Sequence, residues 1–117
     1  MAAEKKGDYG WFEGTLGIGD VYDTEGILCV GNTHIEGTIF ADQSGKLRVY
    51  QGMSEANCDD YITEIAFAAC AAPGDGEAWT VKSVGIYCRI EILNDSGVAM
   101  TIVRMGWKLQ SHRGVSR

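Results

Sequence analysis

The fold is decided by two stretches, THIEGTIFADQSGKLRVYQGM at residues 33–53 and GIYCRIEILNDSGVAMTIVRMGWKL at residues 85–109. In each, polar and apolar residues alternate on both sides of a turn signal, DQSG at residues 42–45 and NDSG at residues 94–97. Period-two alternation gives a strand one buried face and one wet face, which is the pattern of stacked antiparallel sheets. We therefore predict an all-β protein, an antiparallel β-sandwich that is jelly-roll-like.

Strand-like segments recur along most of the chain, and about eight strands are expected. They cover residues 13–18, 26–30, 33–41, 46–53, 61–69, 77–81, 85–93 and 98–109. Four of them carry a clear inward-facing set: Thr33, Ile35, Gly37, Ile39, Ala41, Leu47, Val49, Gln51, Ile86, Cys88, Ile90, Ile92, Thr101, Val103, Met105, Trp107 and Leu109. Burial of these side chains, at roughly 1.5–3 kcal/mol for each large one, is the main stabilising contribution.

One segment leaves its secondary structure open. Residues 55–72 are rich in alanine, and Ile62, Ile65 and Ala69 would also fit a helical stripe. Tyr61, Ile62 and Thr63 favour a strand, as does the rhythm of the neighbouring strands. A strand over residues 61–69 is the preferred prediction, with a helix as the alternative.

The chain has 117 residues, enough for one domain with its own core. We expect an extended N-terminal arm at residues 1–25, the sandwich domain at residues 26–110 and a basic tail at residues 111–117. The polar start of the chain has no signal-peptide core, so synthesis in the cytoplasm is expected. Sixteen glycines against one proline suit short strands joined by tight turns.

Charge is unevenly distributed. The net charge is −6, and residues 7–107 hold 15 acids against five bases. Such a body would repel nucleic acid and anionic lipid, so we expect neither nucleic-acid nor membrane partners. The basic tail could contact an acidic neighbour, or could simply be a solvated end.

The four cysteines are too widely spaced for a CxxC element, and a zinc site would need scattered ligands. Cys29 and Cys88 lie in apolar segments typical of buried free thiols, whereas Cys58 lies in a polar turn and is expected to be exposed. A cytoplasmic origin favours reduced thiols, although two disulfides in three connectivities are possible. We predict no metal site and no cofactor.

No catalytic motif is recognisable. Asp59, Asp60 and Glu55 could offer oxygens to calcium, but a solvated acidic turn fits them better. His34 lies in a strand without a nucleophile motif, and the glycines at residues 14–19 precede no helix that would make a phosphate loop. We therefore expect a protein that is not an enzyme, and a small hydrolase with an acidic site stays a remote alternative.

Aromatic residues on the solvent side are the most useful functional signal. Phe40, Tyr50 and Tyr87 are expected on wet strand faces, where they could form a subunit interface, pack under the arm or stack on sugar rings. All three possibilities remain open from the sequence.

Residues 31–109 resemble a β-sandwich module found in virion proteins of tailed bacteriophages. The resemblance rests on ADQSG at residues 41–45, KLRVYQG at residues 46–52, a polar loop at residues 54–60, a Pro/Gly turn, YCRIEI at residues 87–92 and the Asn94-Asp95 turn. The chain departs from the pattern at Cys58, where a tryptophan is usual, and at Ile92-Leu93-Asn94. Such turn and core residues indicate the fold more than the function.

The resemblance implies a virion structural protein, most directly a capsid decoration or cement protein acting by oligomerisation and surface binding. Its implied partners are other copies of the chain, for example in a trimer, and a major capsid or tail protein of the virion. We expect Trp11, Phe12, Tyr22, Phe40 and Tyr50 to form the interface. The alternative is a carbohydrate-binding adhesion module of a phage tail or fibre, with surface glycans as ligands.

Overall fold

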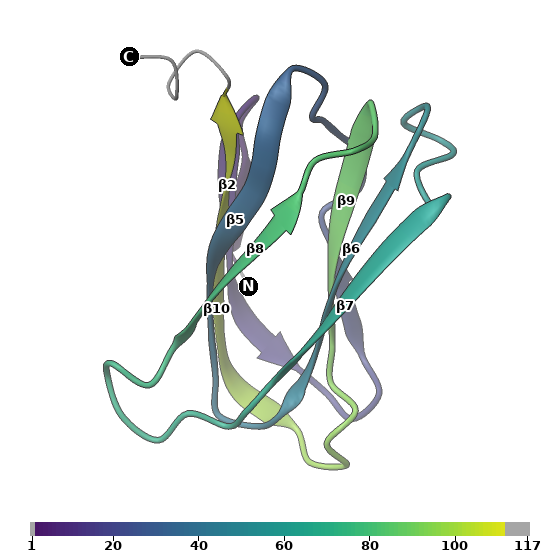
Figure 1. Ribbon diagram of the computed structural model, residues 1–117. Coiled ribbons are helices and arrows are strands. Elements are labelled where there is room, and N and C mark those ends of the chain that lie inside the picture. The colour runs from purple at the N-terminus through teal and green to yellow at the C-terminus, as the bar shows by residue number, and fades with distance from the viewer. Residues whose placement is uncertain (1, 112–117) are drawn as a thin grey trace.

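The computed structural model describes residues 2–111 and is an antiparallel β-sandwich (Figure 1). The described residues form the strands β1 (Ala2–Lys5), β2 (Tyr9–Leu16), β3 (Val21–Asp23), β4 (Ile27–Leu28), β5 (Asn32–Ala41), β6 (Gly45–Gly52), β7 (Tyr61–Phe67), β8 (Glu77–Lys82), β9 (Tyr87–Leu93) and β10 (Met100–Ser111). The all-β prediction is confirmed. The expected basic tail lies almost entirely outside the described residues.

The strand order is that of a jelly roll. One sheet, here called the first sheet, runs β1-β2-β10-β5-β8, and the second runs β3-β9-β6-β7, with β4 also paired to β9. The antiparallel pairs are nested, because β2 pairs with β10, β3 and β4 with β9, β5 with β8, and β6 with β7. A long double hairpin that rolls up on itself gives this arrangement.

The core lies between the two sheets and contains the predicted inward-facing residues. Ile35, Ile39, Ala41, Leu47, Val49, Gln51, Cys88, Ile90, Ile92, Val103, Met105, Trp107 and Leu109 are all buried. Of the other four predicted residues, Thr33 and Gly37 are half-buried. The two expectations at strand starts were wrong. Ile86 precedes β9 and is exposed, and Thr101 is exposed where the register between β10 and β2 shifts. Alternation therefore holds only where the ladder is regular.

Residues 61–67 form strand β7, so the helical alternative for this segment is excluded. The strand pairs with β6 along its whole length, from Tyr61 opposite Gln51 to Phe67 opposite Gly45. It is an edge strand of the second sheet, and only Phe67 is fully buried. One-sided pairing explains why its alternation is weak and why its sequence was ambiguous.

The expected N-terminal arm is instead part of the first sheet. Strand β2 pairs with β10 from Leu16 opposite Met100 to Tyr9 opposite Lys108, and β1 covers its other edge. Phe12 and Leu16 are buried in the core. The prediction failed because backbone hydrogen bonds hold β1, which has few apolar side chains to reveal it. Residues 21–23, also assigned to the expected arm, form the short strand β3 of the second sheet.

Candidate binding surfaces

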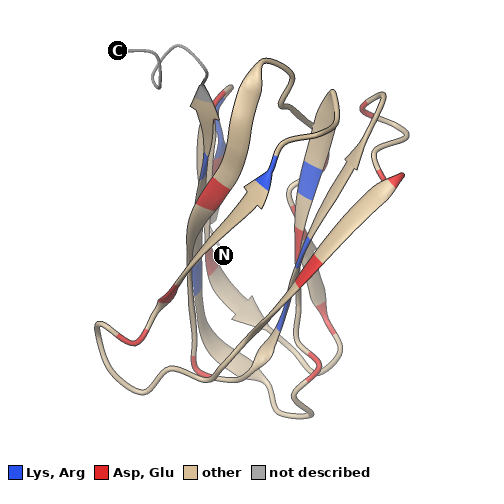
Figure 2. Ribbon diagram, in the orientation of Figure 1, with Lys and Arg blue, Asp and Glu red and all other residues tan. Residues whose placement is uncertain are grey.

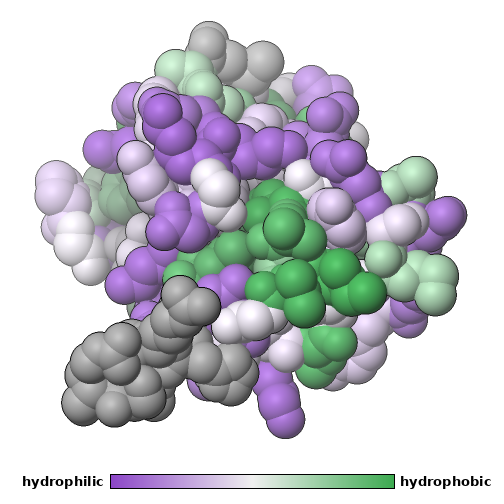
Figure 3. Space-filling model, turned by 90° about the horizontal axis from the view of Figure 1, so that it is seen from above, coloured by the Kyte–Doolittle hydropathy of each residue, from purple (hydrophilic) through white to green (hydrophobic). Residues whose placement is uncertain are grey.

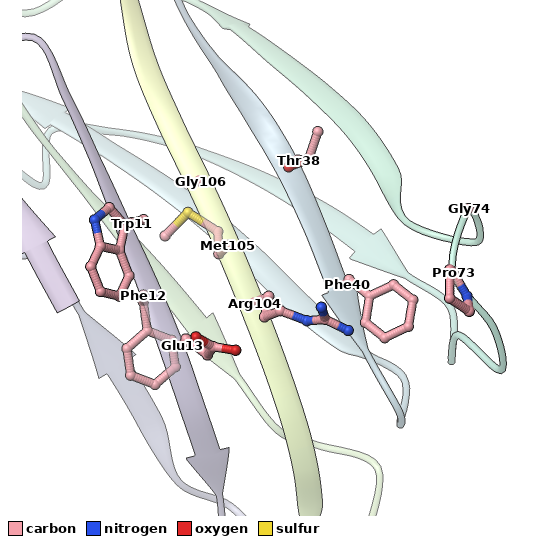
Figure 4. Close-up of a pocket in the computed structure, with 10 residues that line it drawn as sticks. All are labelled: Trp11, Phe12, Glu13, Thr38, Phe40, Pro73, Gly74, Arg104, Met105 and Gly106. Carbon is pink, nitrogen blue, oxygen red and sulfur yellow. The ribbon is translucent and has the colours of Figure 1, made fainter. Parts of the chain in front are cut away.

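A shallow open depression lies on the outer face of the first sheet (Figure 4). Its volume is about 470 Å³. Strands β2, β5 and β10 and the loop between β7 and β8 contribute its lining: Trp11, Phe12, Glu13, Thr38, Phe40, Pro73, Gly74, Arg104, Met105 and Gly106. The depression therefore spans the middle three strands of the sheet.

Strand register explains the shape of the depression. Gly106 on β10 lies opposite both Trp11 on β2 and Thr38 on β5. Because Gly106 has no side chain, this row has a gap between the indole and the threonine. A Cβ added at Gly106 would meet no atom closer than 4.0 Å, so the space above the glycine is open.

The next row of the same face carries charge. Arg104 on β10 lies opposite Glu13 on β2 and Phe40 on β5. The guanidinium of Arg104 stacks over the Phe40 ring, 4.6 Å from its centroid. Within residues 2–111, neither Arg104 nor Glu13 makes an ion pair. Their polar atoms face the depression and have no hydrogen-bond or ion-pair partner among the residues that the structure describes.

A second surface lies at the end of the sandwich where β6 ends and β9 begins. It is called the apolar end and consists of Leu28, Val30, Met53, Tyr61, Val84 and Ile86. These side chains are between 44% and 67% exposed. Met53, Tyr61, Val84 and Ile86 line a shared hollow of about 250 Å³, together with one charged residue, Asp60. Figure 3, which looks down on this end, shows a continuous hydrophobic patch at its centre.

The apolar end is built on a firmly held backbone. The N–H groups of Cys29 and Val30 donate to the carbonyl oxygen of Ile86, at 2.8 and 3.1 Å, which ties the β4 segment to the loop after β8. Beneath this loop, the buried side chain of Gln51 makes further hydrogen bonds to backbone groups. Residues 83–86 carry no charge, and Figure 2 shows this loop without a charged residue.

The outer face of the second sheet is occupied by its own charge network. Arg48 pairs with Glu64 at 2.8 Å and with Glu91 at 3.1 Å, and the Tyr50 hydroxyl donates to Glu91 at 3.0 Å. Arg89 stacks on the Tyr50 ring at 3.8 Å and pairs with Asp23. Burial, together with Glu91, raises the pKa of Tyr50. The Tyr50 ring is therefore already engaged within the chain.

Three of the five expected interface residues, Trp11, Phe12 and Phe40, lie at the depression, but only Trp11 and Phe40 have side chains on the outer face of the sheet. Phe12, by contrast, is 2% exposed and stacks on Tyr22, with ring centroids 3.9 Å apart, so it belongs to the core of this chain. Alternation along β2 sends Trp11 outward and Phe12 inward. Tyr22 is half-buried by this stacking, and Tyr50 lies under Arg89.

Sequence reasoning missed the residues that shape both surfaces. Gly106 matters because it has no side chain and so leaves a gap between its neighbours. The sequence of one strand does not show which residues of the adjacent strands lie beside that gap. Val84 and Ile86 lie in the loop before β9, and strand alternation wrongly placed Ile86 inward. The exposed apolar residues between residues 82 and 87 were the available clue.

The remaining candidates form no site among the described residues. Within residues 2–111, no three His, Cys, Asp or Glu side chains are placed to hold a metal ion. His34 is exposed on β5. The same part of the chain contains no helix long and apolar enough to cross a membrane.

Cys58 was expected to be exposed, and this was wrong. It is buried, and its thiol approaches the carbonyl oxygen of Glu55 at 3.7 Å. The polar turn folds back over the thiol, and burial raises the pKa of Cys58. All four cysteines are buried free thiols.

Comparisons with known proteins add little to this description. No family model matches the chain, and no curated protein matches it. Among solved structures, the chain is similar to one described as the crystal structure of CapF with the inhibitor 3-isopropenyl-tropolone, with 20% sequence identity and a TM-score of 0.35. The match covers 93% of this chain but only 30% of that one. The chain therefore spans less than a third of that structure's length.

Proposed function

We propose that this protein is a virion structural protein of a tailed bacteriophage, a decoration or cement protein that acts by associating with other copies of itself and with a capsid or tail surface. The observation that carries the association is the apolar end, six exposed apolar side chains on a backbone fixed by hydrogen bonds. The virion setting is supported by the sequence resemblance of residues 31–109.

The removal of apolar surface from water supplies the free energy for this contact. Single soluble chains seldom expose a large continuous apolar patch without using it. Each square ångström of apolar surface removed from water contributes roughly 25 cal/mol. Because the patch is rigid before contact, little conformational entropy is lost on association.

A second copy of the chain is the partner that the charges favour at this surface. Two copies with a net charge of −6 repel each other, and a patch whose hollow is lined by a single charged residue, Asp60, is where they approach at a low Coulomb cost. A patch at one end of the sandwich can pair with the same patch of a second copy in an isologous contact. On a preformed shell, many such weak contacts act together.

The association test is the solution mass of the full chain over a range of concentrations. We expect the mass to rise from 12.7 kDa to a multiple of it. Ile86→Asp should keep the protein monomeric, because it places a carboxylate in the patch. Ile102→Asp is the matched control, since Ile102 is 45% exposed against 44% for Ile86 and lies at the opposite end of the sandwich. A wild-type monomer at every concentration, or equal effects of both substitutions, would contradict self-association.

The virion setting has a separate test. Mass spectrometry of purified phage particles should find the chain in many copies per particle, and its release by low salt or mild denaturant should leave the shell intact. Particles of the phage that encodes the chain but lack the protein would refute the virion role, whatever the solution mass shows.

A further inference from the structure

We infer that the depression on the outer face of the first sheet is a binding site for a neutral sugar ring of a glycan. This function is additional to self-association, since the depression and the apolar end consist of different residues, with no member in common. Four features of the depression support it: an exposed indole, an open floor, unpaired polar groups and balanced charge.

Trp11 supplies the stacking surface. It is 38% exposed, whereas Trp79 and Trp107 are buried in the core. Figure 4 shows Trp11 and Phe40 on opposite sides of β10, with Arg104 between them. The apolar C–H face of a pyranose ring packs well on a flat aromatic side chain that keeps one polar edge in water.

Gly106 supplies the open floor next to the indole. With no side chain at this position, a ring lying against Trp11 can approach the backbone of β10. The distance from β2 to β5 across β10 is about 10 Å, from two strand spacings, which accommodates one sugar ring with its hydroxyls. A flat peptide strand would instead need an open sheet edge, and β10 is central.

The polar groups around the floor fit hydroxyl groups. Arg104 offers N–H donors, Glu13 offers carboxylate acceptors, and Thr38 offers a hydroxyl that does both. None of these side chains makes a hydrogen bond to another residue in the part of the chain that the structure describes. A purely apolar ligand would displace water from Arg104 and Glu13 without replacing the hydrogen bonds that the water made.

Charge selects a neutral sugar. Glu13 lies opposite Arg104 in the β2–β10 register, so the two charges balance at the site. The whole chain is negative, which disfavours uronate or sialate groups. An open site that holds a single ring binds weakly, with a Kd on the order of 1 mM, and repeated copies raise the avidity.

The test uses the full chain and two readouts. Trp11 is the solvent-exposed tryptophan, so titration with methyl glucoside, methyl galactoside and methyl mannoside should give a saturable change of tryptophan emission with at least one of them. A glycan array covers longer neutral glycans. Gly106→Leu keeps the reporter and fills the floor, so it should weaken binding about tenfold or more. Trp11→Ala should abolish retention on the array.

Two controls separate this site from the association surface. Ile86→Asp should retain sugar binding, and Ile102→Asp should do the same, with circular dichroism showing that every variant is folded. The inference is overturned if no neutral sugar changes the emission and no neutral glycan is retained, if only anionic glycans bind, or if Gly106→Leu and Trp11→Ala bind like the wild type. None of these results bears on the solution mass.

Discussion

The N–H group of Val84 donates a 2.7 Å hydrogen bond to the side-chain oxygen of Gln51, joining the loop after β8 to strand β6 of the other sheet. The same oxygen accepts from Gly85 at 3.0 Å, and the amide nitrogen donates to the carbonyl oxygen of Lys82 at 2.9 Å. A single buried amide thus closes the sandwich under the apolar end. Stability and the proposed contact depend on the same loop.

Gln51→Leu should lower the free energy of unfolding by about 2–3 kcal/mol. Leucine has a similar size, but it leaves two backbone N–H groups and one carbonyl group without a buried partner. Urea denaturation measures the change. Gln43→Leu in the DQSG turn is the control and should stay within about 0.5 kcal/mol of the wild type. Equal stability of Gln51→Leu and the wild type would show that water can form the hydrogen bonds that these backbone groups lose.

Asn94→Ala should cost about 2–3 kcal/mol. Asn94 is fully buried after β9, and its amide nitrogen donates to the carbonyl oxygens of Leu16, Gly17 and Val98, at 3.1, 3.1 and 2.8 Å. This side chain connects the end of β2 to the β9–β10 turn. Thermal unfolding measures the loss, and Ser96→Ala in the same turn should cost less, because Ser96 is only partly buried.

Alanine at two neighbouring glycines of the first sheet should give opposite results. A Cβ at Gly37 would overlap the backbone carbonyl of Gly106, so Gly37→Ala should destabilise the protein by about 3 kcal/mol. A Cβ at Gly106 has open space, so Gly106→Ala should change stability little. Chemical denaturation of both variants decides the point. A small loss of stability in Gly37→Ala would mean that the backbone of β10 shifts easily to make room for the added methyl group.

The carboxylate of Asp42 should make stability depend on acid pH. Burial alone would raise its pKa, but hydrogen bonds from Thr101 and Ile102 outweigh burial and lower the pKa below its usual value. Because the folded state favours the carboxylate, its contribution is complete near neutral pH and is lost as the pH falls below about 4. Asp42→Asn should cost about 1 kcal/mol at pH 7.

Urea denaturation of wild type and Asp42→Asn at several pH values tests this. The difference between them should be constant from about pH 7 to 5 and should shrink at lower pH. A difference that grows on acidification would reverse the sign and refute the assignment.

The thiols should be unreactive in the native state. All four cysteines are buried. The hydrogen bond with Cys29 and burial raise the pKa of Cys88, and burial raises the pKa of Cys58. The same hydrogen bond lowers the pKa of Cys29 to about 7, so it is complete burial, at 0% exposure, that protects the Cys29 thiol from reagents. Only the thiolate attacks disulfide reagents. A coloured aromatic disulfide should therefore label the folded protein slowly and titrate four thiols after denaturation. Rapid labelling of one native thiol would show that its burial is transient.

The sequence by itself determined the sandwich and most of its core. Alternation on either side of the DQSG and NDSG turns predicted β5, β6, β9 and β10 within a few residues, together with the inward position of Gln51. Alternation is a local property, since each strand must present its apolar side chains to one face whatever its partner is. That is why these residues could be assigned without knowing the pairing.

Only the tertiary structure decided where the chain ends meet and which surfaces are open. Strands β2 and β10 are about 90 residues apart in the chain, and their pairing makes residues 9–16 of the expected arm an inner strand of the first sheet, with Phe12 inside and Trp11 outside. The same pairing placed Gly106 beside Trp11 and so opened the depression. Such contacts depend on which segments are neighbours in space, and the side-chain pattern of one segment holds no information about its distant partner.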